Sequence, residues 1–282
     1  MGSVIIVTII SLSSLAGVSA VILYFVGQRF QVIEDPMIDI IQAELPSANC
    51  GGCGFPGCKN FAEILVAAET LEGLNCPVAG NEVMKSIAVM LGKTAEEADP
   101  AVALLLCNGA PEFRARTTYY DGVENCFMEH SLYIGETDCA YGCLGNGDCV
   151  KACQFDAIAI NNVTKLPVIS DDKCVACNSC VKACPRNLIE LRKKTKKNRK
   201  IYVACSNCEK GATARKACKV ACIACKKCLK ICEFEAITIK DNLAYIDVQK
   251  CTMCRKCADE CPTNSILEIN FPPRKLKKED DL

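Results

Sequence analysis

The sequence CVACNSCVKACP, residues 174–185, carries four cysteines in the spacing C-x2-C-x2-C-x3-C and ends in a proline. A second stretch, CTMCRKCADECP at residues 251–262, has the same spacing. Four thiolates so close together in one loop are the ligands that a [4Fe–4S] cluster requires, and this spacing is typical of bacterial ferredoxins. Both stretches therefore predict cluster-binding loops.

Two further stretches are variants of this pattern. CIACKKCLKIC has the regular spacing but is followed by Glu233, and CAYGCLGNGDCVKAC has stretched first intervals. The segments FDAIAI and FEAITI follow these two variants, which predicts a tandem repeat of short strands leaving cluster-bearing turns. In such pairs the fourth cysteine of each motif binds the neighbouring cluster. The expected ligand sets are Cys139, Cys143, Cys149 and Cys184; Cys174, Cys177, Cys180 and Cys153; Cys222, Cys225, Cys228 and Cys261; and Cys251, Cys254, Cys257 and Cys232.

A different cysteine pattern, ANCGGCGFPGC, lies at residues 48–58 and is followed by Cys76 and Pro77. The apolar residues between them recur with helical periodicity, so we expect a loop to supply three thiolates and a helix to return the chain for the fourth. The glycines let the backbone wrap closely around an anionic cluster. We expect a fifth [4Fe–4S] cluster here, with structural zinc as the alternative. Its expected ligands are Cys50, Cys53, Cys58 and Cys76, and the periodic apolar residues are Phe61, Ile64, Leu65, Ala68 and Leu71.

Five of the 25 cysteines fall outside these sets. We expect Cys107 and Cys126 to be buried free thiols, which pack as small apolar side chains. Cys205, Cys208 and Cys218 stay undecided, because the spacing CSNC fits either a further metal site, alternative ligands for a neighbouring cluster, or free thiols. The single histidine, His130, is expected at the surface or in packing. We predict no catalytic residue on this chain and no cofactor besides the clusters.

An uncharged segment, residues 4–26, lies near the N-terminus. About 20 apolar residues suffice to cross a hydrocarbon core. No basic residue precedes the segment, which favours a retained membrane anchor over a cleaved signal peptide. Arg29 follows it, so the positive-inside rule predicts the N-terminus outside and the iron–sulfur domains in the cytoplasm, at a bacterial cell (inner) membrane. Reduced cytoplasmic thiols favour metal binding over disulfides.

The charge of the chain is balanced, with 33 basic and 33 acidic residues, which argues against a nucleic-acid partner. We find neither a G-x-G-x-x-G that opens a predicted helix nor a Walker A motif, so no nucleotide site is predicted. The segment LRKKTKKNRK, residues 191–200, carries seven basic residues. We interpret it as a solvated hairpin or linker, and the alternative is a docking patch for an acidic soluble ferredoxin or anionic lipid.

The order of these parts resembles the B subunit of the Rnf complex: an N-terminal membrane helix, then CGGCGFPGC, then CNGAPEFRARTTYYDGVENC, then paired ferredoxin motifs. The resemblance covers nearly the whole chain, and the second pair is similar to the long form found in anaerobes. It implies a subunit of a membrane-bound ferredoxin:NAD oxidoreductase complex that couples electron transfer to Na⁺ or H⁺ translocation. Implied partners are soluble ferredoxin and other membrane and flavoprotein subunits, with no complete active site on this chain.

The alternative is a membrane-tethered polyferredoxin that carries electrons to a different redox enzyme. The N-terminal cysteine module follows the anchor closely, so we expect electrons to run from the ferredoxin motifs to this module and then to membrane partners.

The expected fold is α+β, with one transmembrane helix, a small helical [4Fe–4S] module and two tandem 2[4Fe–4S] ferredoxin-like domains. The expected boundaries are 1–30 for the anchor, 31–100 for the module, 101–136 for a connecting segment, 137–191 for the first ferredoxin-like domain, 192–200 for a basic linker, 201–270 for the second ferredoxin-like domain, and 271–282 for a charged tail.

Overall fold

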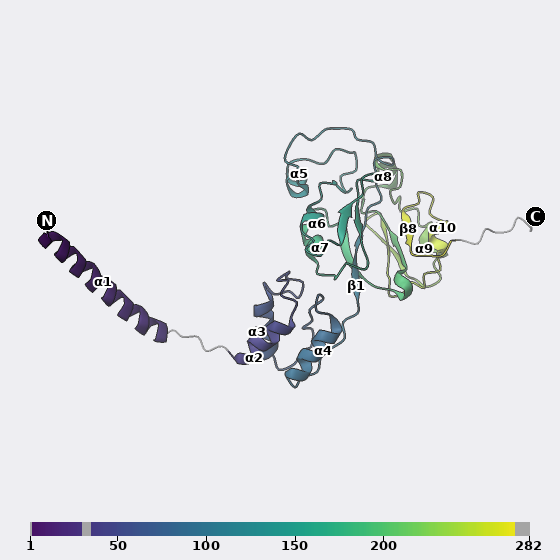
Figure 1. Cartoon of the computed structure of the whole chain (residues 1–282). Coiled ribbons are helices and arrows are strands. Elements are labelled where there is room, and N and C mark those ends of the chain that lie inside the picture. Colours follow the sequence, from purple (N-terminus) through teal and green to yellow (C-terminus); the bar gives the residue numbers. More distant parts are fainter. Residues whose placement is uncertain (1, 30–34, 274–282) are drawn as a thin grey trace, which may run out of the picture.

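The computed structural model describes residues 2–29 and 35–273. The expected charged tail lies outside the described residues from position 274 onward. The chain forms one long helix, a small helical module and two units of short strands and helices, which follow one another in that order (Figure 1). This is the expected mixture of helix and strand.

The first helix, α1 (Gly2–Arg29), is apolar along its length. Its segment Ile5–Arg29 is long and apolar enough to cross a membrane. The most apolar 18-residue window has a mean hydropathy of 2.3, and none of that window is buried against the rest of the protein. It stands apart from the remaining elements in Figure 1. It is the one such helix among the described residues, in agreement with the expected anchor.

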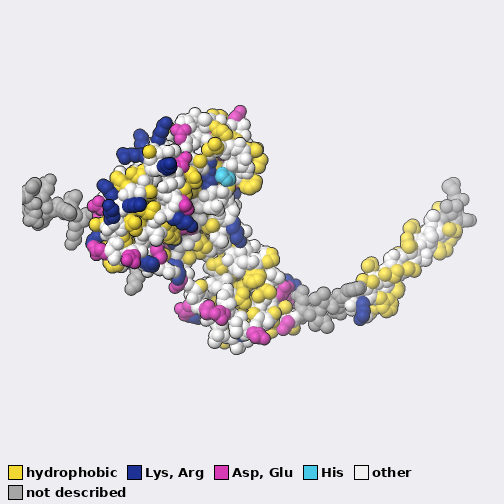
Figure 2. Space-filling view, turned by 180° about the vertical axis from the view of Figure 1, so that it is seen from behind, with side chains coloured by type: hydrophobic (Ala, Val, Ile, Leu, Met, Phe, Trp, Pro, Cys, Tyr) yellow, Lys and Arg dark blue, Asp and Glu magenta, His cyan; other side chains and the backbone are white. Residues whose placement is uncertain are grey.

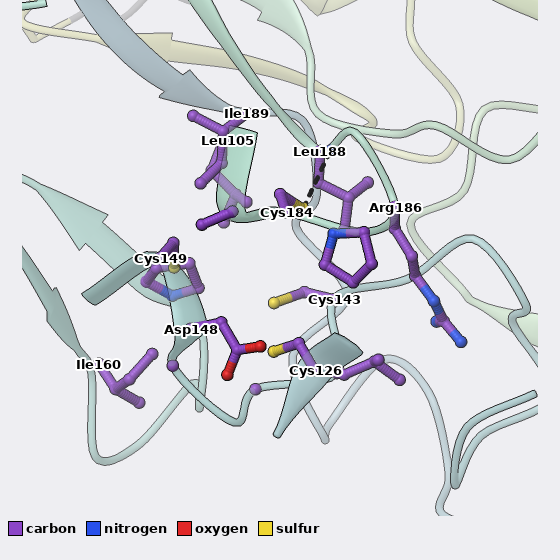
Figure 3. Close-up of a pocket in the computed structure, with 16 residues that line it drawn as sticks. Leu105, Cys126, Cys143, Asp148, Cys149, Ile160, Cys184, Arg186, Leu188 and Ile189 are labelled. Atoms are coloured by element: carbon purple, nitrogen blue, oxygen red, sulfur yellow. Dashed lines mark hydrogen bonds between the residues drawn. The ribbon is translucent and has the colours of Figure 1, made fainter. Parts of the chain in front are cut away.

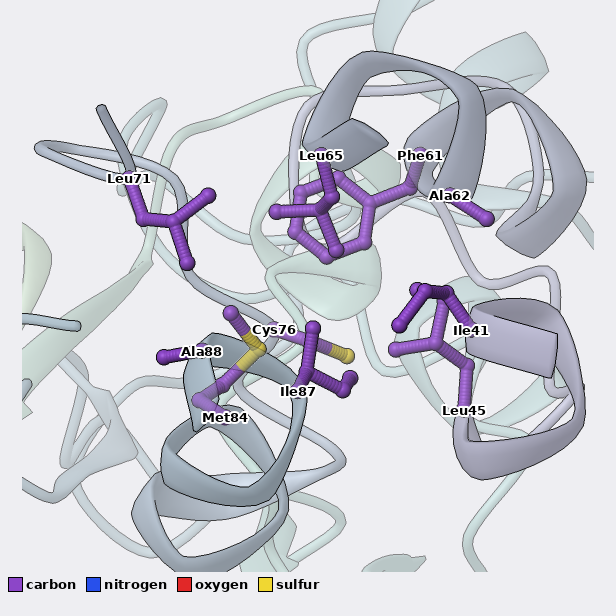
Figure 4. Packing of buried hydrophobic residues seen from close by; sticks show 10 residues of the cluster. All are labelled: Ile41, Leu45, Phe61, Ala62, Leu65, Leu71, Cys76, Met84, Ile87 and Ala88. Atoms are coloured by element: carbon purple, nitrogen blue, oxygen red, sulfur yellow. The ribbon is translucent and has the colours of Figure 1, made fainter. Parts of the chain in front are cut away.

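The N-terminal module consists of α2 (Pro36–Glu44), α3 (Cys58–Ala67) and α4 (Gly80–Met90). Asp35 caps α2 by accepting a hydrogen bond from the Met37 N–H at 2.9 Å, with Pro36 at the first helical position. Figure 4 shows the core where the three helices meet, with the Cys76 sulfur among apolar side chains. The core residues are Ile41, Leu45, Phe61, Ala62, Leu65, Leu71, Cys76, Met84, Ile87 and Ala88.

The helix α3 is shorter than the apolar periodicity predicted, because it ends at Ala67 and Leu71 lies in the following turn. The Lys93 ammonium donates to the carbonyl oxygens of Leu65 and Val66 at 2.8 and 3.0 Å. A cation at this position satisfies carbonyls that have no partner within the helix and stabilises its C-terminal end. The shortened helix lets the chain turn back and bury Cys76 in the same core.

The first ferredoxin-like unit comprises β1 (Ala101–Leu105), α5 (Cys126–Leu132), α6 (Asp148–Lys151), β2 (Ile158–Ile160), β3 (Pro167–Ile169), α7 (Ser179–Ala183) and β4 (Ile189–Lys193). The strand β1 pairs antiparallel with β4, and β2 pairs antiparallel with β3. The segment 101–136, expected as a connection, therefore supplies a strand to this unit. The predicted strand in FDAIAI is confirmed as β2.

The second ferredoxin-like unit repeats this topology. It comprises β5 (Lys200–Val203), α8 (Gly211–Ala217), α9 (Lys227–Ile231), β6 (Ile237–Lys240), β7 (Leu243–Ile246), α10 (Lys256–Asp259) and β8 (Ile266–Ile269). The strand β5 pairs antiparallel with β8, and β6 with β7. The predicted strand in FEAITI is confirmed as β6, so the tandem repeat in the sequence is a repeat in the fold.

The two units pack against each other through their first strands. Leu104 of β1 and Tyr202 of β5 belong to one buried apolar cluster. The Asn108 N–H donates to the Ala204 carbonyl at 3.0 Å, and the Ser206 hydroxyl donates to the Leu106 carbonyl at 3.1 Å. The basic segment between the units is largely structured, as β4, the 3₁₀ turn η1 (Lys196–Asn198) and β5. The hydrogen bonds of Asn108 and Ser206 hold the ends of β1 and β5 side by side.

Candidate metal centres

Three of the cysteine loops share one backbone conformation. In each, the residue before the second cysteine and the residue after it have positive φ angles, which non-glycine residues rarely adopt. Successive N–H groups in such alternating conformations form a concave nest that binds anions, here a cradle suited to an anionic cluster. Strain of this kind persists where a function requires it. The residues are Ala176 and Asn178, Ala224 and Lys226, and Met253 and Arg255.

The third cysteine of each loop begins a short helix and is buried. These residues are Cys149 in α6, Cys180 in α7, Cys228 in α9 and Cys257 in α10.

The fourth cysteine of each motif also lies in a repeated turn. The Ala157 N–H donates to the Cys153 sulfur at 3.4 Å, and the Leu188 N–H donates to the Cys184 sulfur at 3.3 Å. At the equivalent position of the second unit, the Ser265 hydroxyl lies 3.2 Å from the Cys261 sulfur. Burial opposes ionisation of Cys261, but the hydrogen bonds from Ser265 and Thr263 outweigh it and lower its pKa.

Cys180 lies with the other members of its expected set. Burial raises the pKa of Cys180 to about 11. The thiols whose negative charge adds to this shift are Cys174, Cys177 and Cys153. The exchange of fourth cysteines between motifs, expected from the sequence, therefore agrees with the positions of these side chains.

The second unit gathers its cysteines in the same way. One pocket is lined by the whole expected set of Cys222, Cys225, Cys228 and Cys261. Burial raises the pKa of Cys257 to about 12, and charges on the nearby thiols of Cys251, Cys254, Cys228 and Cys232 raise it too. Cys225 and Cys254 are solvent-exposed, so both sets of the second unit reach the surface.

The first loop of the first unit differs from the expectation. Gly145 and Gly147 have positive φ angles of 87° and 78°, at the positions where the regular loops have theirs, and the residue between them is Asn146. Asn146 therefore occupies the place of the second cysteine. Its amide donates to the Glu129 carboxylate at 2.6 Å.

A cysteine from outside the motif stands beside this loop. The pocket in Figure 3 is lined by Cys126, Cys143, Cys149 and Cys184, whereas Cys139 does not line it. The expected grouping of Cys139 with this set is thus not what the structure has, because the loop needs only Cys143 and Cys149 and α5 delivers Cys126 instead. Cys126 is half-buried among these thiols, not packed as an isolated apolar side chain. Burial raises the pKa of Cys149 to about 12, with charges on Cys126 and Cys184 as the next causes.

The N-terminal module holds its own cysteines near the start of α3. The Asn49 carboxamide oxygen accepts the Cys58 N–H at 2.8 Å and so fixes the start of that helix. The Ala79 N–H donates to the Cys76 sulfur at 3.4 Å. Burial raises the pKa of Cys76, and charges on Cys53 and Cys50 contribute to the rise. The cysteine loop thus faces the buried fourth cysteine, as the spacing predicted.

The module also touches the first ferredoxin-like unit at a cysteine. A Cβ added at Gly52 would lie 3.0 Å from the Cys177 Cα and carbonyl oxygen. Only a glycine allows so close a backbone approach without displacement. The loop of the module is therefore in contact with a predicted cluster ligand of the next set.

Three of the remaining thiols lie together. Cys107, Cys205 and Cys218 line one pocket with Cys139. Cys107 is therefore partly buried beside other thiols and is not the buried, isolated thiol that we expected. Cys208 does not line it, and its sulfur lies 3.6 Å from the Ser206 carbonyl oxygen. His130 is exposed, as expected.

Within residues 2–29 and 35–273, no three Cys, His, Asp or Glu side chains converge on a point where one metal ion could be held. A tetrahedral zinc site would need sulfurs about 2.3 Å from a single ion and hence about 3.8 Å from one another. Each thiolate of a [4Fe–4S] cluster binds a different iron, so the sulfurs stand farther apart. Nests of N–H groups, gathered thiols and wide spacing fit such clusters better than zinc.

Three family models match the chain. A putative Fe-S cluster family matches residues 45–78, and two 4Fe-4S dicluster families match residues 138–189 and 221–265. These three segments contain the N-terminal module loop and both pairs of ferredoxin motifs.

Similar proteins cover most of the chain. The B subunit of the Na(+)-translocating ferredoxin:NAD(+) oxidoreductase complex of Acetobacterium woodii is 38% identical over 84% of this chain and 70% of its own length. The B subunit of the ion-translocating oxidoreductase complex of Methanosarcina acetivorans is 37% identical over 94% of this chain and 99% of its own length. The B subunit of the proton-translocating ferredoxin:NAD(+) oxidoreductase complex of Clostridium ljungdahlii is 37% identical over 88% of this chain and 87% of its own length.

Proposed function

This chain belongs to the B-subunit family of Rnf-type ion-translocating oxidoreductase complexes, and we propose that it takes electrons from a reduced soluble ferredoxin and delivers them to membrane partners. It is an iron–sulfur electron-transfer subunit of such a complex. The names of two relatives include ferredoxin and NAD(+), which supports the donor and the final acceptor proposed here. The nineteen expected cysteines other than Cys139, together with Cys126, are proposed as the thiolate ligands of five clusters.

The observation that carries the proposal is the succession of cysteine sets in the N-terminal module and in both ferredoxin-like units. The series begins at the module that follows the membrane helix, where Gly52 meets Cys177. It ends at the exposed Cys225 and Cys254 of the second ferredoxin-like unit. When bound, each [4Fe–4S] cluster supplies a one-electron carrier whose potential responds to hydrogen bonds, charge and exposure. The chain's own residues hold the sites in order and tune them.

The outer end of the series has a surface suited to an acidic redox partner. The exposed side chains of Lys226, Lys227 and Lys230 follow the exposed Cys225, and none of the three forms an ion pair within the described part of the chain. Phe234, 44% exposed, adds an apolar contact. Figure 2 shows Lys and Arg side chains on the end of the molecule that carries this unit. A basic rim around an exposed thiol favours docking and fast association of an acidic protein.

The basic segment at residues 191–200 is a weaker candidate for docking. Lys193 pairs with Asp99 at 2.6 Å, Lys194 donates to the Asp171 carbonyl at 2.9 Å, and Lys200 pairs with the Asp171 carboxylate. Most of this charge is therefore used within the protein, which favours a hairpin or linker between the two units over a docking patch.

Ion translocation is proposed to belong to partner subunits. The membrane helix α1 contains no acidic residue, and an ion path through a bilayer requires polar or ionisable groups. The relatives are named as Na(+)-translocating and proton-translocating, and both coupling ions are therefore compatible with this family. The iron–sulfur units are proposed to lie on the cytoplasmic side, where reduced ferredoxin is present.

The proposal is tested by ferredoxin-driven NAD⁺ reduction in washed membranes with and without this protein. We expect the activity to disappear when the protein is absent and to return on complementation with the full chain. Unchanged activity without the protein would overturn the proposal. It would favour the alternative, a tethered polyferredoxin that serves a different redox enzyme, which copurification of its partners would then identify.

A further inference from the structure

Four thiols that no regular motif requires meet at the junction between the two ferredoxin-like units. Cys107 follows β1 and Cys139 precedes the first cysteine loop, so both come from the first unit. Cys205 follows β5 and Cys218 follows α8, so both come from the second unit. All four line a single pocket. The site is thus assembled only when the two units pack together.

Each of the four sulfurs accepts a hydrogen bond from an N–H group, as metal-bound thiolates in iron–sulfur sites do. The buried side-chain amide of Asn207 donates to the Cys139 sulfur at 3.6 Å, and the Asn207 backbone N–H donates to the Cys205 sulfur at 3.4 Å. The Cys143 N–H donates to the Cys107 sulfur at 3.5 Å. The Val220 N–H is hydrogen-bonded to Cys218. Hydrogen bonds to the sulfurs are among the features that set the potential of an iron–sulfur cluster.

The residues around this pocket are held in place by hydrogen bonds. Asn207 is fully buried, and its side-chain oxygen accepts the Glu209 N–H at 2.8 Å, which fixes the direction of its amide group. The Arg114 guanidinium bonds to the carbonyls of Gly109 and Cys143 and to the Thr137 hydroxyl, so a cation stands beside the pocket. A positive charge in this position offsets the negative charge of four thiolates around an anionic cluster.

The altered loop of the first unit explains why Cys139 is available. Asn146 occupies the second-cysteine place of that loop, and Cys126 lines its pocket with Cys143, Cys149 and Cys184. That set is complete without Cys139. The 25 cysteines then divide into six sets of four, and Cys208 is left over.

We propose that Cys107, Cys139, Cys205 and Cys218 hold a sixth [4Fe–4S] cluster, which links the cluster series of the two ferredoxin-like units. The site touches a predicted ligand of each neighbouring set, Cys143 of the first unit and Cys222 of the second, whose N–H bonds to the Cys205 sulfur. The proposal rests on the iron–sulfur electron-transfer role of the chain, and it gives the position at which electrons pass from one unit to the other.

The first test is the iron and acid-labile sulfide content of the full chain, purified anaerobically in detergent. We expect about 24 irons per chain, against about 20 for five clusters. Zinc is measured in the same sample. A content of about 20 irons, or one zinc in addition to about 20 irons, would overturn the proposal. Neither result depends on ferredoxin or on membrane partners, so failure of this inference is distinct from failure of the proposed function.

The second test is the double variant Cys107→Ala/Cys218→Ala, with Cys208→Ala as the matched control from the same region. We expect the double variant to lose about four irons and one component of the Mössbauer and EPR spectra. We expect the control to keep the full content. Equal iron content in the double variant and the control would overturn the proposal.

A third variant removes no cysteine, so it tests the proposal even if the double variant does not fold. Asn207→Ala removes the amide donor to the Cys139 sulfur, so the reduced cluster loses a stabilising hydrogen bond. In an EPR-monitored redox titration, we expect one midpoint potential to move to a more negative value while the others remain. Identical titrations of the variant and the unmodified chain would contradict the assignment.

Discussion

The two ferredoxin-like units share one strand order and one loop conformation, yet they differ where it matters for electron transfer. The second unit has regular motifs, and its Cys225 and Cys254 reach the solvent. The first unit has Asn146 in place of one cysteine, recruits Cys126 from α5, and presents Cys177 to the N-terminal module. The difference supports the proposed direction of transfer, in which electrons enter at the second unit and pass toward the membrane through the first.

The largest expected effect concerns the irregular loop of the first unit. We expect Cys126→Ala to lose one cluster, about four irons per chain, because no other thiol takes its place in the pocket of Figure 3. Adding Asn146→Cys restores the regular motif, so the double variant should recover the iron content. If Cys126→Ala keeps its full iron content, Cys126 is not a ligand. If the double variant does not regain the lost iron, although Asn146→Cys alone is fully loaded, Asn146 does not occupy the place of a ligand.

The contact between the module and the first unit gives the next effect. Gly52→Ala places a methyl group 3.0 Å from the Cys177 backbone and should weaken this contact by about 1–3 kcal/mol. We expect slower reduction of the module by ferredoxin, measured by stopped-flow absorbance.

The matched control for this contact is Gly54→Ala. This residue has a φ of 92° but no atom within 4 Å of an added Cβ. The control should share a modest loss of stability and keep the transfer rate. Equal rates in both variants would show that the contact at Cys177 does not carry the transfer.

A smaller effect is expected from the exposed lysines of the second unit. Changing Lys226, Lys227 and Lys230 together to Gln should slow ferredoxin oxidation about tenfold at low salt, because steering by opposite charge is lost. High salt should remove the difference. Stopped-flow rates as a function of ionic strength measure both. The matched control changes Lys193, Lys194 and Lys197, of which the first two are engaged within the protein. A larger effect in the control would place the docking surface on the basic segment instead.

The smallest expected effect concerns the hydrogen bonds to the fourth cysteines of two motifs, Cys261 in the second unit and Cys184 in the first. Ser265 donates to Cys261 in the second unit, whereas the equivalent residue in the first unit is Leu188, which offers Cys184 only its N–H. Ser265→Ala should lower one midpoint potential by about 40 mV, which corresponds to about 1 kcal/mol for one hydrogen bond. A redox titration measures the shift. An unchanged set of potentials would show that the hydroxyl does not tune the cluster.

Much of this arrangement follows from cysteine spacing alone. The regular motifs predict loops, the repeat of FDAIAI and FEAITI predicts β2 and β6, and the swapped fourth cysteines are expected from paired motifs. Local sequence is sufficient here because the loop conformation depends on residues that are close together in the chain.

The irregular loop differs from its prediction, although the sequence contains a signal. Cys143 and Cys149 are separated by the same interval as Cys174 and Cys180, with Asn146 at the midpoint and Gly145 and Gly147 beside it. Aligning the motif by its third cysteine shows the missing ligand.

The junction site could not be predicted in the same way. Cys107 and Cys205 meet because β1 and β5 pack together, and that packing depends on the tertiary structure of both units. The strand β1 was not predicted either, since its partner β4 lies far along the chain and the run AVALL has no turn signal that marks a hairpin.

We propose that electrons from ferredoxin reach the membrane partners only through the N-terminal module. The most direct measurement is ferredoxin-driven NAD⁺ reduction in membranes that carry Cys53→Ala, alongside ferredoxin-driven bleaching of the remaining clusters. We expect NAD⁺ reduction to be lost while the ferredoxin-like units are still reduced. Undiminished NAD⁺ reduction in this variant would show that electrons reach the membrane partners without passing through the module.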